Sequence, residues 1–390
     1  MQKPPQTLRP ARADGSSTVG GSGTHTPPHP SPRESDPAAD DTGEVTFLPI
    51  TPNGLIRFDA VAELGLRGEL LSALRSGEVQ RVRRGVYTQV TDVGASSHWE
   101  RAAERYRIGV IAAAQTMDAP VFTSFSAIAL ARLPIFGGWP DEVYVLSRNG
   151  SANRRRGVIA TASRGPVESR LIDGCATTSI EFSLIQLARR ATLAAALTAV
   201  DAAIRVPRFG GARPMTTIEA LRAQHEAMLP YPGSLRVEAV LSRATPLADT
   251  PLETVSRLAF EQLGFEAPTL QLPMWLPELG RQAFLDFYWE SVDAGAEADG
   301  RGKYLSGDGS AGSAAHTVIR EKDRENAIRR QLRAFDRWDW ADALALGPLA
   351  ARLDAMGVPR TRSPKLMIPK RDAPAARPIR GAGPERPSQR

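Results

Sequence analysis

Five residues in the last third of the chain have the types and order of a metal-dependent hydrolytic site. In chain order they are Glu253, Asp286, Glu297, Asp299 and Lys303. Hydrolysis of a phosphodiester needs two or three carboxylates that converge on Mg²⁺, a cation near the developing negative charge, and a group that orients water. We expect Asp286 and Glu297 to hold the metal, Lys303 or Asp299 to orient the water, and Glu253 to complete the outer shell of the site.

A helix and three strands must bring these residues together. The segment TPLETVSRLAFEQLGFEAP predicts a helix with Thr250 as its N-cap and Gly264 at its end. TLQLPMWL, RQAFLDFYWE and VDAGAEADG predict three strands. Alternation places Asp286 on one face of the second strand, with Leu285 and Phe287 on the other. Side chains opposite each other on adjacent strands lie about 5 Å apart, so acids on the second and third strands can share a cation.

The third strand leaves more than one explanation open. Alanine and glycine in VDAGA are poor strand formers and would hold the acids less rigidly than β-branched residues would. The segment EADG is also compatible with an acidic cap on an ordinary turn. A working metal site, an inactive remnant of one and a simple turn all fit the sequence.

The residues 247–357 resemble a known nuclease domain. The phrases PLETVSR, LGFEAP, LDFYW and AEADGRGKY are similar to the Vsr-like branch of the PD-(D/E)XK nucleases. This resemblance implies that Asp286 is the first-strand aspartate, Glu297 the glutamate of the second acidic motif and Glu253 the helix glutamate. Asp299 then occupies the position of the family's lysine, and Lys303 is a displaced lysine beyond the strand.

A second segment has the pattern of a small DNA-binding domain. GLRGELLSALRSGEVQRVRRGVY has leucines at helical spacing, a glycine that ends the helix, and a basic β-hairpin. Helix, turn, helix and hairpin is the plan of a winged helix-turn-helix. The alternative is a hairpin whose arginines only face solvent. The residues that we expect to contact DNA are Arg67, Arg75, Arg81, Arg83, Arg84 and Tyr87.

This segment also resembles a known family. It is similar to the N-terminal winged helix of AbiEi-type antitoxins of type IV toxin–antitoxin systems, through Gly77, Val79, Arg84, Gly85 and Tyr87. The phrases TSFSAIALARLP and TTSIEFSLIQLAR resemble the region that follows it in such proteins. The resemblance implies DNA as a partner and a cognate toxin as a second one.

The chain therefore divides into five expected parts of an α/β protein, α+β overall. Residues 1–45 are a disordered tail and 46–95 the winged helix-turn-helix. Residues 96–246 form a mostly helical middle domain with some strands. Residues 247–357 form the restriction-endonuclease-like α/β/α domain, and 358–390 a disordered basic tail.

Two arginine-rich segments each have two explanations. NRRRG, at residues 153–157, is a hairpin turn that either faces solvent or contacts phosphate. The expected helix in SAAHTVIREKDRENAIRRQLRAF carries arginines that either contact the DNA backbone or pair with Glu321, Asp323 and Glu325 on a solvated helix.

The charge is unevenly distributed along the chain. The net charge is +6, with 9 basic and 2 acidic residues in 360–390 and 4 basic and 6 acidic residues in 1–45. The part between them is nearly neutral, at +1. Any DNA-binding surface must therefore be a local patch. No apolar run of about 18 residues predicts a membrane span, and the single Cys175 excludes an internal disulfide. We expect a cytoplasmic protein without a membrane partner.

Three functions are compatible with these features. The first is a DNA-binding protein with a Mg²⁺-dependent endonuclease-like domain that cleaves phosphodiester bonds. The second is a non-catalytic, antitoxin-like transcriptional repressor that carries a degenerate nuclease fold. The third is a protein–protein adaptor whose winged helix binds a protein partner.

Overall fold

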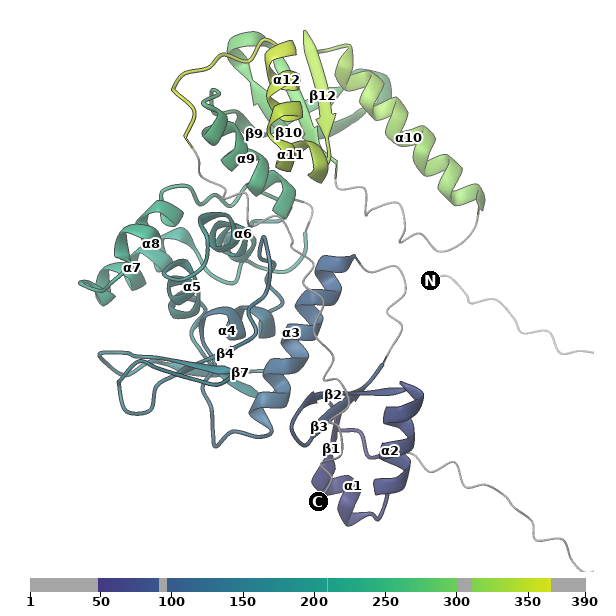
Figure 1. The fold of residues 1–390 in the computed structure, drawn as a ribbon. Coiled ribbons are helices and arrows are strands. Elements are labelled where there is room, and N and C mark those ends of the chain that lie inside the picture. The colour runs from purple at the N-terminus through teal and green to yellow at the C-terminus, as the bar shows by residue number, and fades with distance from the viewer. Residues whose placement is uncertain (1–47, 91–96, 209, 300–310, 366–390) are drawn as a thin grey trace, which may run out of the picture. The chain divides into compact units, whose positions relative to one another are not determined.

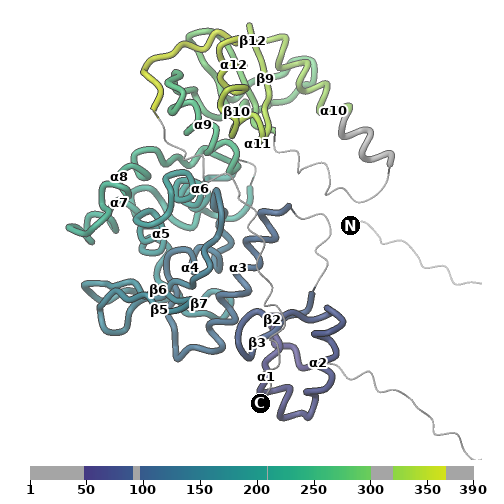
Figure 2. Tube along the Cα trace, viewed as in Figure 1, coloured from purple at the N-terminus to yellow at the C-terminus, as the bar shows by residue number. Residues whose placement is uncertain are grey.

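The computed structural model describes residues 48–90, 97–208, 210–299 and 311–365, and the side chains of 311–318 are not described (Figures 1 and 2). Within these ranges the chain is a mixed α/β structure, α+β overall, with small sheets and many helices. No described helix is both long enough and apolar enough to cross a bilayer.

The first structured part is a three-stranded sheet with two helices. Its elements are β1 (Leu55–Arg57), α1 (Phe58–Glu63), α2 (Arg67–Ser76), β2 (Val79–Arg83) and β3 (Val86–Gln89). The strands are antiparallel in the order β1-β3-β2. Gly77 ends α2 in the left-handed conformation, with φ +81°, and Gly85 has φ +75° at the turn of the hairpin. The predicted helix and hairpin are therefore confirmed.

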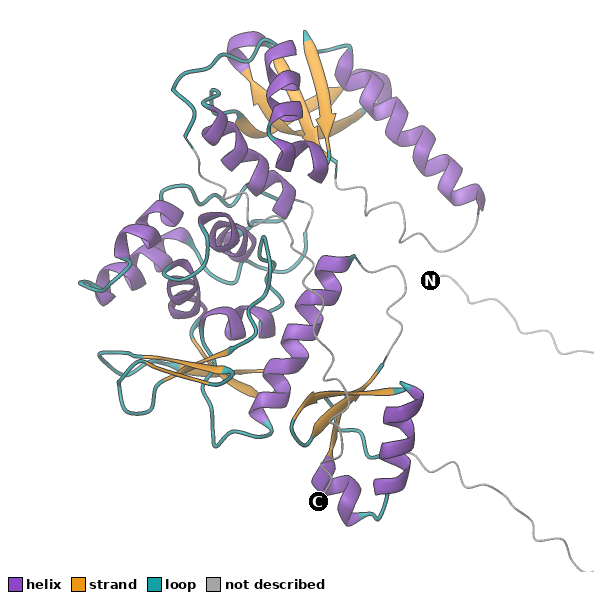
Figure 3. Ribbon diagram, viewed as in Figure 1, coloured by secondary structure: helices purple, strands orange, loops and turns teal. Residues whose placement is uncertain are grey.

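The middle part is mainly helical, as Figure 3 shows. Its helices are α3 (His98–Ala114), α4 (Ser124–Leu130), α5 (Ile180–Ala188), α6 (Leu193–Ile204), α7 (Ile218–Met228) and α8 (Ser234–Leu241). Its strands are β4 (Val143–Leu146), β5 (Asn153–Arg155), β6 (Val158–Thr161), β7 (Ser169–Ile172) and β8 (Cys175–Thr178). Alanines fill the buried side of α6, which allows neighbouring helices to approach closely.

The last part has the element order helix, three strands, helix and strand, followed by two short helices. The elements are α9 (Pro251–Leu263), β9 (Thr269–Leu276), β10 (Arg281–Trp289), β11 (Ala294–Ala298), α10 (Ala311–Arg329), β12 (Ala334–Trp338), α11 (Trp340–Ala345) and α12 (Gly347–Ala355). Two 3₁₀ turns, η1 (Pro277–Leu279) and η2 (Glu290–Val292), join the first three strands. The strand order is β12-β11-β10-β9. β10 is antiparallel to both neighbours, whereas β11 and β12 are parallel, because α10 carries the chain back between them.

Two hydrophobic clusters cover the two faces of this sheet. Phe287 and Ala296 pack with Phe260 of α9 in one cluster, and Leu285 packs with Ile328 of α10 in the other. A Cβ atom on Gly295, between Ala294 and Ala296, would lie 2.5 Å from Leu285 Cδ2. Gly295 in VDAGA thus leaves room for the Leu285 side chain. This explains why a poor strand former occupies the middle of the strand.

The expected alternation is interrupted at Asp286. Leu285 and Phe287 belong to different clusters, so the prediction that they share a face of the sheet is wrong. Opposite Asp286, Gln271 has φ +54°, and the regular pairing of β9 with β10 omits this pair. A local irregularity of this kind re-aims one side chain of a strand, and here that side chain is Asp286.

The folded region continues beyond the boundary expected at residue 357. Val358 is buried in the cluster of α9. The Glu266 N–H donates to Pro359 O at 2.9 Å, and the Thr361 N–H donates to Gly264 O at 2.9 Å. The described structure therefore continues past residue 357, to residue 365.

Candidate functional site

The start of α9 holds Glu253 in place. The Thr250 hydroxyl oxygen accepts from the Glu253 N–H at 3.2 Å and donates to Glu253 Oε1 at 2.9 Å. Oε2 accepts from the Asp249 N–H at 2.9 Å. The predicted N-cap at Thr250 and the end of the helix at Gly264 are confirmed. Glu253 is only 4% exposed, so the cap also buries a carboxylate beside the sheet.

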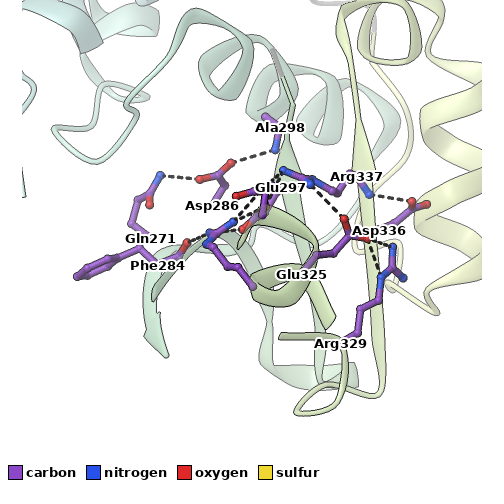
Figure 4. A network of polar contacts seen from close by, with 11 residues as sticks. Gln271, Phe284, Asp286, Glu297, Ala298, Glu325, Arg329, Asp336 and Arg337 are labelled. Atoms are coloured by element: carbon purple, nitrogen blue, oxygen red, sulfur yellow. Dashed lines mark hydrogen bonds and ion pairs between the residues drawn. The ribbon is translucent and has the colours of Figure 1, made fainter. Parts of the chain in front are cut away.

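Gln271 connects two of the predicted acids. Its Nε2 donates to Glu253 Oε2 at 2.8 Å. The same Nε2 donates to Asp286 Oδ1 at 3.2 Å (Figure 4). The side chain is buried, and its Oε1 has no hydrogen-bond partner among the described residues. Sequence reasoning missed Gln271. The only signal was a glutamine inside the apolar strand TLQLPMWL.

Asp286 lies at the centre of the acidic group. Its Oδ2 accepts from the Ala298 N–H of β11 at 2.9 Å. Burial raises the pKa of Asp286, and the charges of Glu253 and Glu297 raise it further, to about 7. Hydrogen bonds from Ala298 and Gln271 offset only part of this effect. The structure therefore brings Glu253, Asp286 and Glu297 close enough to repel one another.

Glu297 of β11 is held by two arginines. Arg324 Nη2 lies 2.5 Å from Oε1 and Arg324 Nη1 lies 3.1 Å from Oε2, in a bidentate contact. Arg337, which pairs with Glu297 in the register of β11 with β12, places Nη2 3.2 Å from Oε2. Arg324 also donates to Phe284 O at 3.2 Å. Glu297 is only 4% exposed, so its charge is compensated inside the protein.

Asp299 lies at the end of β11, next to the same arginine. Its N–H donates to Trp338 O at 2.8 Å, which continues the pairing with β12. Although burial acts to lower the pKa of Arg337, the charges of Glu297, Asp299 and Glu321 together raise it. The predicted Lys303 lies outside the described residues.

The predicted metal ligands fit a cation only in part. No group of three or more His, Cys, Asp or Glu side chains in the described ranges is placed to hold a metal ion. Both oxygens of Glu297 already contact guanidinium groups. Glu253 and Asp286 are joined by the Gln271 amide, and they also accept hydrogen bonds from Thr250 and Asp249 (Glu253) and from Ala298 (Asp286). Two carboxylates and the unpartnered Gln271 Oε1 form an all-oxygen set, the donor type that Mg²⁺ prefers. A metal would therefore be held by Glu253 and Asp286, by Gln271 only if its amide turned to present Oε1 in place of Nε2, and by Glu297 only if it left its arginines.

The arginines in α10 and directly after it are mostly paired. Arg324 contacts Glu321, Arg329 contacts Glu325, and Arg330 contacts Glu278 of η1. Arg337 of β12 reaches Glu321 and Glu325 as well (Figure 4). This favours the ion-paired explanation for the helix over DNA backbone contact.

The six residues expected to contact DNA differ in exposure. Arg67, Arg75, Arg81 and Arg84 are exposed, whereas Arg83 and Tyr87 are half-buried. Tyr87 packs against the small core of the first sheet, so its ring stabilises that core. Burial lowers the pKa of Arg83.

Comparisons with known proteins give no relative. No protein-family model matches the chain, and no curated protein matches it.

Proposed function

We propose that this chain is a DNA-binding protein whose last part is a Mg²⁺-dependent, endonuclease-like domain acting on phosphodiester bonds. The observation that carries the proposal is the convergence of Glu253, Asp286 and Glu297 from α9, β10 and β11. Burial, together with the charges of Glu253 and Glu297, raises the pKa of Asp286 to about 7. Perturbed carboxylates of this kind concentrate at functional sites.

Stability alone does not explain this arrangement. Burying a charged group whose charge is not fully compensated costs roughly several kcal/mol of folding free energy. Carboxylates that are packed together also repel one another. Glu297 has two arginine partners. Asp286 has no arginine or lysine partner among the described residues, and it accepts only from Gln271 and Ala298. A bound cation would supply the missing positive charge.

The mechanism assigns a separate task to each residue. Mg²⁺, when bound, polarises the phosphate and lowers the pKa of a coordinated water. Glu253 and Asp286 would bind and orient the cation, and Gln271 would join them if its amide turned to present Oε1. Arg337, with Asp299 beside it, supplies positive charge next to the site in place of a lysine on β11. Arg324 holds the Glu297 carboxylate in place through its bidentate contact.

The order of elements supports the resemblance to the PD-(D/E)XK nucleases. A helix glutamate precedes a strand aspartate, and the glutamate of the second acidic motif follows on the adjacent strand, with helices packed on both faces of the sheet. The first sheet, with α2 and a basic hairpin, supports a winged helix that brings the protein to DNA.

The double ion pairing of Glu297 favours a second function. Two arginines already neutralise the acid that should join the metal site. A non-catalytic, antitoxin-like repressor that keeps the nuclease fold as a scaffold would have this geometry. It would bind its promoter through Arg81 and Arg84, and a cognate toxin would be its second partner.

Plasmid nicking separates the two functions. We expect the purified protein to nick supercoiled plasmid with Mg²⁺ and to lose this activity in Asp286→Asn. The matched control is Glu278→Gln, an exposed carboxylate outside the acidic group. Nicking that survives in Asp286→Asn would overturn the site. Absence of nicking, together with tight binding to the upstream DNA, would favour the repressor.

A further inference from the structure

A strongly basic segment lies in the middle part of the chain, apart from the hairpin of the first sheet. Residues 148–172 contain six arginines and one acidic residue, Glu168, a net charge of +5. Residues 46–359 as a whole carry only +1. All six arginines are exposed: Arg148, Arg154, Arg155, Arg156, Arg164 and Arg170.

Two of these arginines are neutralised by nearby acids. Arg148 Nη1 lies 2.6 Å from Asp118 Oδ2, and Arg154 contacts Glu142. In the described part of the chain, the other four have no ion pair. Many exposed arginines elsewhere do have one, including Arg57 and Arg330. The four resemble Arg67, Arg75, Arg81 and Arg84, which also have no ion pair within the described ranges. We name Arg155, Arg156, Arg164 and Arg170 the arginine surface.

These residues are spread along one region of strands. Arg155 ends β5, and Arg156 lies in the turn before β6. Arg164 follows β6, and Arg170 lies on β7 (Figure 2). Phe122 joins the two sheets, because its backbone bridges Val145 of β4 and Thr177 of β8. At the usual strand spacing the region spans roughly 20–25 Å.

That span suits an extended polyanion. Duplex DNA carries one negative charge per about 1.7 Å of its axis, so a contact of this length faces on the order of a dozen phosphates. Charges on an edge strand also prevent pairing with other chains, which would account for the exposed β5. Arg156 and Arg164 lie in turns, where there is no strand edge to protect.

We infer that the arginine surface is a second nucleic-acid contact, which binds the phosphate backbone of duplex DNA without reading its sequence. The inference rests on the proposed DNA-binding function. It assigns to the middle part the anchoring role, and leaves sequence reading to the first sheet and α2.

The salt dependence of binding by the full chain tests the inference. Each lost phosphate contact reduces the slope of log K against log [salt] by about 0.9. With a mixed-sequence duplex, we expect replacement of all four residues of the arginine surface by alanine to reduce the slope by about 3 to 4. The paired control, Arg148→Ala with Arg154→Ala, should change it by less than about 1. The basic tail is present in every variant, so its contribution to the slope cancels when the variants are compared.

A second set of variants guards against misfolding. Replacing the same four arginines by lysine keeps the charge and should keep the slope, because phosphate contact needs charge and not a guanidinium. An unchanged slope in the alanine variant overturns the inference, and would fit an acidic protein as the partner of this surface. If Arg81→Ala with Arg84→Ala abolishes binding while the alanine variant binds normally, the inference alone fails. If the unaltered protein binds no duplex, the proposed DNA binding fails as well.

Discussion

Arg324 binds both carboxylate oxygens of Glu297, at 2.5 and 3.1 Å, and so joins α10 to β11 in the interior of the last sheet. Only 4% of Glu297 is exposed, and Arg337 provides its other cation. This contact has two effects. It stabilises a buried carboxylate, and it occupies the oxygens that a metal would need.

Removing Arg324 should destabilise the fold. Arg324→Ala leaves a buried carboxylate with one cation, and loss of one partner from a buried pair costs about 3 kcal/mol. Urea unfolding measures this loss. Arg330→Ala, which breaks an exposed pair with Glu278, should cost less than about 1 kcal/mol. Equal costs for the two variants would contradict a structural role for the Glu297 contact.

The pKa of Asp286 predicts a pH-dependent penalty. Burial and the neighbouring acids raise its folded-state pKa from the ordinary value of 3.8 to about 7, so the fold favours the protonated form. The free energy of unfolding therefore keeps its full value below about pH 4. It falls as the pH rises towards 7, by at most about 4 kcal/mol. Asp286→Asn should remove the penalty and be more stable than the unaltered protein at pH 8, with little difference near pH 4. The control Asp323→Asn, at an exposed position, should show no such crossover.

The sequence predicted the elements better than it predicted the site. Helix caps and the presence of strands depend on nearby residues, so Thr250, Gly264 and the three strands around Asp286 were predictable. The face of β10 that Leu285 and Phe287 occupy was not, because the alternation is interrupted at Asp286. The two arginines on Glu297 were not, because α10 and β12 are far from β11 in the sequence. Gln271 was missed because its function depends on an irregular backbone opposite Asp286. The Ala/Gly character of VDAGA indicated a weak strand, and only the packing of Leu285 explains Gly295.

Magnesium should stabilise the folded protein at high pH. A cation held by Glu253, Asp286 and Gln271 binds only the native state, so 10 mM Mg²⁺ should raise the melting temperature at pH 8. The increase should be smaller near pH 5, where Asp286 is protonated. Gln271→Leu and Asp286→Asn should each remove it. A Mg²⁺ effect that persists in Asp286→Asn would place the metal elsewhere.

The hairpin of the first sheet should contribute to DNA binding. Arg81 and Arg84 are exposed and have no ion pair within the described ranges. Arg81→Ala with Arg84→Ala should weaken binding to the upstream DNA and reduce its salt slope by about 2. The matched control is Arg57→Ala, because Arg57 is paired with Asp59. A gel shift at several salt concentrations measures both, and equal binding by the two variants would show that the hairpin only faces solvent.

Gly264 should be far more sensitive to substitution than Gly77. Both end a helix in the left-handed conformation, with φ +82° and +81°. At Gly77 an added Cβ meets nothing within 4 Å, whereas at Gly264 it would lie 2.1 Å from the Arg362 carbonyl oxygen.

Gly77→Ala should therefore cost only the backbone strain, about 1–2 kcal/mol. Gly264→Ala must also displace the segment around Arg362, whose neighbours bond to Gly264 O and to Gln262 O. Amide hydrogen exchange measures each effect locally. In Gly264→Ala, we expect protection to fall at Thr361 and Lys365 as well as at the end of α9. In Gly77→Ala, the loss should stay within α2 and its turn. If protection at Thr361 and Lys365 is unchanged in Gly264→Ala, the segment after α12 does not depend on the close approach at Gly264.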